Sequence, residues 1–111
     1  MPALFFKKPL FLLILEGRKT QTRRLRPLWK EGCIYTILGG PGLRAYVRIT
    51  KYYRQRLGDI TPAQVKAEGF NNLEEFKTTW IKLFGSWNPE TEVHAYEFEL
   101  IQPRKILRPA P

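Results

Sequence analysis

The stretch "GRKTQTRR", residues 17–24, gathers the groups best suited to chemistry in this 111-residue chain. It holds an amine at Lys19, a hydroxyl at Thr22 and guanidinium groups at Arg23 and Arg24. A lysine can act as a base when burial or a neighbouring cation lowers its pKa, and a hydroxyl beside such a base can act as a nucleophile. The same cations could hold a phosphate. The stretch is therefore either the floor of a site for an anionic ligand or a solvated basic turn.

Charge is distributed unevenly along the chain. Residues 1–60 contain 13 basic and three acidic side chains, a net +10, whereas residues 61–111 contain six basic and seven acidic ones, a net −1. Such an asymmetric field favours polyanions or ligands that carry phosphate. A generally basic protein without a specific role for each cation would show the same composition, so charge alone leaves both interpretations open.

Few residues could hold a metal or form a disulfide. The chain has a single cysteine, Cys33, and a single histidine, His94, so we expect no disulfide framework, no metal site and no cofactor. The longest apolar run, "LFLLIL" at 10–15, is far shorter than the roughly 20 residues that span a bilayer. We expect one cytoplasmic domain over residues 1–111, with no membrane contact and with residues 102–111 as a proline-rich extension.

The basic stretch lies between short predicted elements. An apolar helix opening at Pro9 would end at Gly17 and deliver the chain to the basic residues, which can be extended from 20 to 25. Apolar and β-branched residues predict further strands, and "GGPG" at 39–42 predicts a turn. The expected strands in this half of the chain are 3–6, 33–38 and 43–53.

The strand at 43–53 alternates strictly. Its predicted core face consists of Leu43, Ala45, Val47 and Ile49. The opposite face interleaves arginine with tyrosine, a composition that can contact RNA but is also ordinary for a solvated strand. That face comprises Arg44, Tyr46, Arg48, Thr50 and Tyr52.

Two helices and a final strand follow. Thr61, Pro62 and Gln64 form a capping-box pattern for a helix that ends at Gly69. A second helix should begin after Asn72, with its apolar stripe in the core. That stripe is Leu73, Phe76, Trp80, Leu83 and Phe84. A last strand is expected at 93–101. Because strands and helices do not alternate, the order favours a small mixed or antiparallel barrel with packed helices over a doubly wound sheet.

Taken together, these segments resemble the ASCH domain. The resemblance comes from "GRKTQTRR" at 17–24, "RIT" at 48–50, "LGDIT" at 57–61, "AEGF" at 67–70 and "YEFEL" at 96–100, and it covers roughly residues 3–101. It implies an α+β fold, a PUA-like mixed β-barrel of about five or six strands with flanking short helices. PUA-like domains often bind RNA, which makes RNA or a modified nucleoside the expected partner.

The resemblance also implies roles for individual residues. Some bacterial ASCH proteins are amidohydrolases that remove the acetyl group from acetylcytidine, and their lysine, threonine and glutamate match Lys19, Thr22 and Glu68 here. The family's arginine matches Arg24. We therefore expect Lys19, Thr22 and Glu68 as a catalytic set for a metal-independent hydrolase. Nucleoside or RNA contacts are expected from Lys19, Arg23, Arg24 and Arg48.

The main expectation is a protein that binds RNA or a modified nucleoside in a basic cleft, and the hydrolase is the alternative to it. A ribonuclease ranks lower, because His94 is far in sequence from the basic stretch. In a regular strand Lys19 and Thr22 would point to opposite faces. They can share a pocket only if the chain turns near Lys19, which Gly17 makes feasible. Otherwise, Lys19 faces water as most lysines do.

Overall fold

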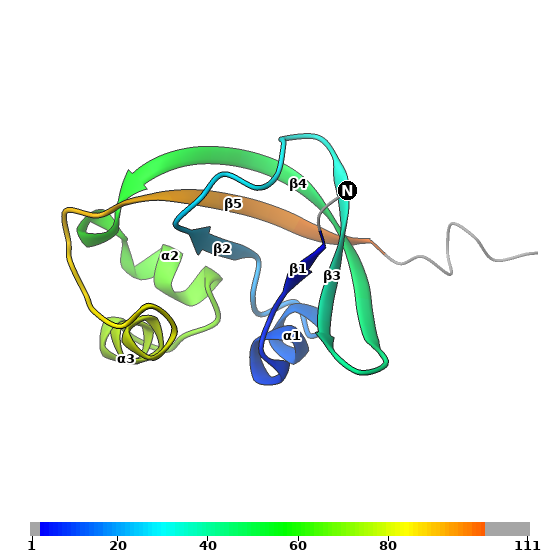
Figure 1. Ribbon diagram of the computed structural model, residues 1–111, viewed down its shortest axis with the longest axis horizontal. Helices are drawn as coiled ribbons and strands as arrows, with labels where there is room; N and C mark the ends of the chain where they lie inside the picture. Colours follow the sequence, from blue (N-terminus) through cyan, green and yellow to red (C-terminus); the bar gives the residue numbers. More distant parts are fainter. Residues whose placement is uncertain (1–2, 102–111) are drawn as a thin grey trace, which may run out of the picture.

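The computed structural model describes residues 3–101, which form one mixed sheet and three helices (Figure 1). The helices are α1 (Lys8–Leu15), α2 (Pro62–Ala67) and α3 (Leu73–Phe84), with a short 3-10 turn at Leu57–Asp59. The strands are β1 (Leu4–Phe5), β2 (Gln21–Arg24), β3 (Ile34–Gly40), β4 (Leu43–Arg56) and β5 (Glu92–Ile101).

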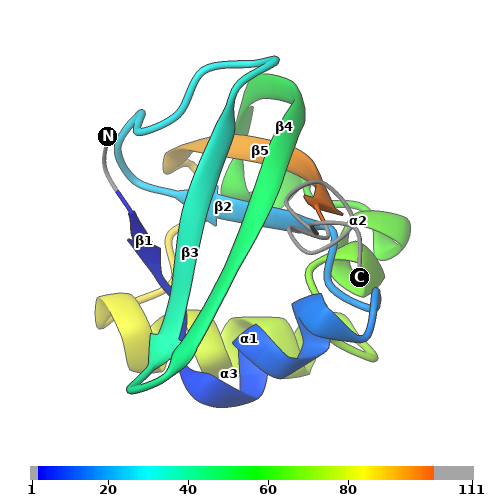
Figure 2. The same ribbon diagram turned by 90° about the vertical axis from the view of Figure 1, so that its right-hand side faces the viewer.

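The five strands make a strongly curled half-barrel. Their order is β1-β3-β4-β5-β2, with β1 parallel to β3 and the remaining pairs antiparallel. The long strands β4 and β5 arch over the molecule, and the three helices lie beneath the arch (Figure 1). Figure 2 shows α1 and α3 at the same end of the molecule from a second direction. The predicted α+β class and a mixed, barrel-like sheet of about five or six strands are thus confirmed, with five strands in a half-barrel.

The core has two parts. The larger cluster lies between α1 and the inner faces of β3, β4 and β5, and includes Phe11, Ile14, Ile37, Val47 and Tyr96. The smaller one joins α2 and α3 to the far ends of β4 and β5 and contains Leu57, Val65, Phe76, Trp80 and Val93. Strand β2 is an edge of the sheet, and the basic stretch therefore runs along a border that the helices cover.

Strand β4 follows its predicted alternation only as far as a bulge. Ala45, Val47 and Ile49 are buried, as expected. The register with β5 then shifts between Ile49 and Lys51. A bulge moves the following side chains to the other face of a strand. The prediction that Tyr52 faces outward was consequently wrong, since Tyr52 packs against the larger core cluster.

Other predicted boundaries moved by one to three residues. The helix at the N-terminus begins at Lys8 and not at Pro9, and β1 is shorter than the predicted 3–6. The predicted turn at 39–42 is partly strand, because β3 continues through Gly40. A side chain at position 39 would collide with Phe11, so glycine there lets β3 and α1 pack closely. Residues 102–111, the predicted extension, lie outside the described residues.

Helix α3 is less buried than its sequence predicts. Its cap is as expected, since the Asn72 side chain accepts a hydrogen bond from the Glu75 N–H. Phe76 and Trp80 are buried, but Leu73, Leu83 and Phe84 are 37–41% exposed. The apolar stripe is wider than the core it meets, which leaves its end over the β2 edge. Within residues 3–101, no helix combines the length and apolar character needed to cross a bilayer.

Candidate functional site

Glu68 lies at the carboxyl end of α2. The helix starts at the predicted capping box, in which Thr61 and Gln64 each accept the other's backbone N–H. After Glu68 the chain turns sharply at Gly69, which has a φ of +102°. A Cβ on Gly69 would lie 2.9 Å from Leu13 Cδ1 and 3.4 Å from Lys19 Cβ. Glycine thus allows the end of α2 to pass directly over Lys19.

Lys19 is held beside Glu68 by the main chain. The N–H groups of Arg18 and Lys19 both bond to the Leu13 carbonyl at the end of α1, and the Thr20 N–H bonds to the Ala67 carbonyl of α2. Strand β2 begins only at Gln21, after Gly17 has turned the chain at a φ of +79°. The turn that the sequence required near Lys19 is therefore present.

The Lys19 ammonium is fully hydrogen-bonded and buried. Its Nζ donates to Glu68 Oε1 at 2.9 Å, to the Glu68 carbonyl at 3.0 Å and to the Gln21 carbonyl at 2.8 Å. Only 3% of the side chain is exposed. Three acceptors match the three protons of a charged ammonium. The expectation that Lys19 faces water is excluded by this geometry.

Arg23 binds the other oxygen of the same carboxylate. Its Nη1 donates to Glu68 Oε2 at 2.9 Å and to Gln21 Oε1, while Nη2 donates to Tyr53 Oη and Nε to Gln55 Oε1. The side chain is completely buried. Arg23 therefore acts within the fold as a clamp on Glu68, and its guanidinium has little left to offer a phosphate.

Burial and charge oppose one another at Lys19. Burial lowers the pKa of the Lys19 amine below its ordinary 10.5, while the Glu68 carboxylate raises it through charge and hydrogen bonding. Arg24 and Arg23 lower it further. The amine is thus poised to release a proton more readily than a surface lysine, and Glu68 Oε1 is the acceptor within reach.

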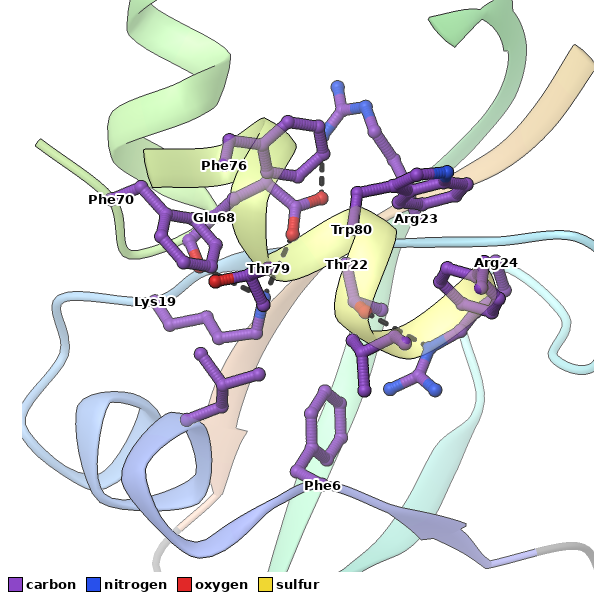
Figure 3. A pocket seen from close by; sticks show the side chains of 13 residues that line it. Phe6, Lys19, Thr22, Arg23, Arg24, Glu68, Phe70, Phe76, Thr79 and Trp80 are labelled. Carbon is purple, nitrogen blue, oxygen red and sulfur yellow. Dashed lines mark hydrogen bonds and ion pairs between the residues drawn. The ribbon is translucent and has the colours of Figure 1, made fainter. Parts of the chain in front are cut away.

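Thr22 and Arg24 remain for a ligand. Thr22 is 3% exposed, and its Oγ1 accepts a hydrogen bond from Arg24 Nε at 3.2 Å. The Arg24 guanidinium lies 4.7 Å from the centre of the Phe6 ring, between Phe6 and Thr22 (Figure 3). No carboxylate among residues 3–101 forms an ion pair with it. Burial lowers the pKa of this guanidinium, and nearby Glu68 partly offsets the effect.

These groups line one pocket under α3. Lys19, Thr22, Arg23, Arg24 and Glu68 form its polar side. Its apolar wall comes from the start of the chain and from α3 (Figure 3). The wall includes Phe6, Leu10, Phe70, Phe76, Trp80, Leu83 and Phe84. The hollow measures about 400 Å³ with its open mouth, but water-sized molecules can occupy only about 40 Å³ of it. It therefore admits a small chemical group more readily than a whole nucleoside.

Two residues considered in the sequence analysis do not line the pocket. Arg48 is on the outer face of β4, where it pairs with Glu99 at 3.6 Å, and it does not line the pocket. His94 is opposite Arg24 in the pairing of β2 with β5, and its Nδ1 is 2.6 Å from Tyr52 Oη. Distance in sequence was a poor reason to separate His94 from the basic stretch, because β5 returns alongside it.

Sequence reasoning missed the apolar wall. Phe76, Trp80 and Phe84 were assigned to the core alone, yet all three line the pocket. Phe6 was not singled out at all. A usable signal was present, because an apolar stripe of five large residues on a 12-residue helix is wider than a small sheet can bury.

Within the described residues, no cluster of three or more potential metal ligands occurs.

The fold matches that of solved ASCH-domain structures. An ASCH domain from Lactobacillus crispatus has a TM-score of 0.75 at 13% identity, covering 88% of this chain and 79% of its own. The ASCH protein of Zymomonas mobilis has a TM-score of 0.64 at 12% identity, covering 98% and 80%. A protein of Enterococcus faecalis with the family designation DUF984 has a TM-score of 0.70 at 23% identity, covering 91% and 77%.

These likenesses establish the ASCH, PUA-like fold that the motifs predicted. At identities of this level they show the fold alone. No protein-family model matches the sequence, and a search of curated proteins found no match.

Proposed function

We propose that this protein binds RNA or a modified nucleoside at the pocket formed by Lys19, Thr22, Arg24 and Glu68, with one small group of the ligand inside it. The observation that carries the proposal is the free end of Arg24. Glu68 is occupied by Lys19 and Arg23, so the pocket retains Arg24 as a cation that forms no ion pair with a carboxylate among residues 3–101. That cation stands beside a hydroxyl and under an aromatic wall. Proteins that bind single-stranded RNA combine the same elements, since bases stack on aromatic rings and cations hold phosphates.

A substitution at Arg24 tests this proposal. Arg24→Gln keeps a polar side chain but removes the charge, and we expect roughly 10- to 100-fold weaker binding of acetylcytidine or of a short single-stranded RNA, as for the loss of a charged hydrogen bond. Arg26→Gln is the matched control, because Arg26 is two residues after Arg24, is exposed and does not line the pocket. Calorimetry supplies both affinities. Equal affinities for the two variants would refute the proposal.

The salt dependence of RNA binding gives a second test. Contacts between cations and phosphates release counterions, so the affinity for single-stranded RNA should fall steeply as salt rises. An affinity that hardly changes between low and moderate salt would mean that the bound RNA does not touch the basic groups of the site.

The second candidate is hydrolysis of acetylcytidine, favoured by the convergence of Lys19, Thr22 and Glu68 on one pocket. Lys19 passes a proton to Glu68 Oε1 and becomes a neutral amine. That amine takes the Thr22 proton as Oγ1 attacks the acetyl carbonyl carbon. The amide C–N bond breaks as the Lys19 ammonium gives that proton to the amino group of cytidine, which leaves. Lys19 then takes a proton from water as the water oxygen attacks the acyl-threonine ester. Acetate leaves, and Lys19 returns the proton to Thr22 Oγ1.

Product formation separates the two candidates. The protein is incubated with acetylcytidine, and cytidine is followed by chromatography. Thr22→Ser retains a hydroxyl and should retain turnover, whereas Thr22→Val keeps the shape and should lose it. If acetylcytidine binds but no cytidine is formed, the function of the pocket is binding alone. Full turnover in Thr22→Val would exclude Thr22 as the nucleophile.

A further inference from the structure

We propose that the ligand of the pocket is a phosphorylated nucleoside, whose phosphate is held by Lys7 and Lys82 in a groove between α1 and α3. This inference rests on the proposed function and narrows it, because a free nucleoside carries no group for these lysines. The phosphate could belong to a free nucleotide or to a residue of an RNA strand, and the chemistry of recognition is the same for both.

The groove adjoins the pocket. Leu10, Phe70, Thr79 and Leu83 line both hollows. Water-sized molecules can occupy about 440 Å³ of the groove, compared with about 40 Å³ of the pocket. A ligand therefore has room for one small group at Thr22 and Arg24, and most of its bulk must lie in the groove.

The charges along the groove are all positive. Lys7 is at one side, before α1, and Lys82 is at the other, on α3; no aspartate or glutamate lines the groove. Neither lysine forms an ion pair with any residue in the range 3–101. The positions one turn before Lys82 on α3 are Thr78 and Thr79, and the positions one turn after it, just beyond the helix, are Gly85 and Ser86; none of these residues is acidic. By contrast, Arg48, Arg54 and Arg56 on β4 each have a carboxylate partner.

Lys7 also stands at a helix end where a cation is unfavourable. The N-terminus of a helix carries partial positive charge and is stabilised by acidic residues. Helix α3 follows this rule, with Glu74 and Glu75 in its first turn. Helix α1 departs from it, because Lys7 is the N-cap, Lys8 follows and the first turn contains no acid. A local rule broken without any gain in stability is typical of a functional position. A bound phosphate would offset this unfavourable charge.

The test compares the affinities of a nucleoside and of its 5′-monophosphate, each measured with the unmodified protein and with one double variant. Calorimetry measures acetylcytidine and acetylcytidine 5′-monophosphate against the unmodified protein and against Lys7→Gln/Lys82→Gln. We expect the monophosphate to bind the unmodified protein about tenfold or more tightly than the nucleoside, as charge-assisted hydrogen bonds imply. The double variant should lose that preference while its affinity for the nucleoside stays the same.

A matched control carries the same change in charge. Lys30→Gln/Lys66→Gln removes two exposed lysines that do not line the groove, and it should keep the preference for the phosphate. Equal binding of nucleoside and monophosphate by the unmodified protein would overturn the inference and leave the proposed function standing. An equal loss in both double variants would also overturn it. Failure of both ligands to bind would instead refute the proposed function.

A short RNA distinguishes the two sources of phosphate. A single-stranded hexamer with acetylcytidine at one end is titrated at several salt concentrations. Tighter binding of the hexamer than of the monophosphate assigns the groove to RNA, and equal binding assigns it to a free nucleotide. In the RNA case, Lys7→Gln/Lys82→Gln should reduce the slope of log affinity against log salt by about 0.7, since the two lysines hold one phosphate and each phosphate of a single strand contributes about 0.7.

Discussion

Two regions of this molecule carry ion pairs of the same length in opposite surroundings. Beneath α2, Lys19 and Arg23 each lie 2.9 Å from a Glu68 oxygen, with side chains that are 0–5% exposed. At the far end of β4, Arg56 lies 3.0 Å from Glu90, and these side chains are 58% and 72% exposed. The N–O distances of these pairs are nearly the same, but only the Arg56–Glu90 pair is exposed to solvent.

The contrast shows what the basic stretch contributes to the fold. Exposed pairs contribute little, because water and salt screen their attraction. A buried carboxylate between two cations does not make the fold more stable than apolar residues would, but neither partner can be removed without leaving a buried charge unpaired. Glu68 therefore fixes the positions of Lys19 and Arg23, whereas the exposed pairs on β4 hold their side chains only weakly.

The largest expected effect is the loss of the Glu68 charge. Glu68→Gln leaves Lys19 and Arg23 buried without a counter-charge and should lower the free energy of unfolding by about 3–5 kcal/mol. Glu90→Gln breaks a pair of equal length and should lower it by less than about 1 kcal/mol. Urea denaturation of both variants measures the difference. Similar losses in the two variants would contradict the distinction between the regions.

A smaller effect should come from the glycine over Lys19. Gly69→Ala places a side chain at a φ of +102° and pushes its Cβ against Leu13, whereas Gly32→Ala has a φ of +86° with open space around it. The backbone conformation alone costs about 1–3 kcal/mol at either position. Gly69→Ala should be the more destabilising of the two by thermal or urea unfolding, and it should also weaken ligand binding. If Gly32→Ala lowers stability by as much as Gly69→Ala, the close approach of α2 to Lys19 does not contribute to the stability of the fold.

The pH dependence of stability should report the buried amine. Because the pKa of Lys19 is lowered in the fold, the unfolded chain binds one proton more between that lowered value and 10.5. The free energy of unfolding should therefore rise with pH across this alkaline window, by at most about 1.4 kcal/mol per pH unit. At pH values below this window, Lys19 is protonated in both the folded and the unfolded state. It then contributes nothing to the dependence of the free energy of unfolding on pH.

Lys19→Met provides the comparison for that slope. The variant should be less stable at every pH, since Glu68 loses a partner, but its alkaline slope should be flatter than that of the unmodified protein. NMR titration of the Lys19 side chain gives the midpoint directly. A midpoint at or above 10.5 would mean that burial does not dominate at this amine.

The smallest effect concerns the helix that carries Glu68. Thr61→Ala removes the cap of α2 and should lower the free energy of unfolding by about 1 kcal/mol. Thr78→Ala is a change of the same type within α3, where the hydroxyl bonds only to the Glu74 carbonyl, and it should stay within about 0.5 kcal/mol. Chemical denaturation measures the free energy of unfolding of both variants. If Thr61→Ala leaves that free energy unchanged, packing alone holds α2 in place.

Local sequence patterns predicted most of the fold. The capping box at Thr61 and the alternation from Leu43 to Ile49 depend on neighbouring residues only, and both are present as predicted. The bulge after Ile49 was missed because it follows from pairing with β5, which is more than 40 residues away. The exposed end of α3 was missed because the extent of the core depends on the whole sheet.

The site could be predicted only in part. The resemblance brought Lys19, Thr22 and Glu68 together, and the structure places all three on one pocket. Sequence could not distinguish Arg23 from Arg24, because both are arginines in one strand. Alternation sends Arg23 to Glu68 and Arg24 to Phe6, and the position of Glu68 is set by contacts between α2 and β2. Which arginine is free for a ligand is therefore a property of the folded chain.

A crystal structure with acetylcytidine 5′-monophosphate bound tests the central claim most directly. The acetyl group should lie beside Thr22 and Arg24, with Glu68 still joined to Lys19 and Arg23. Electron density for the ligand on the outer face of β4, or a Glu68 side chain turned away from both cations, would contradict it.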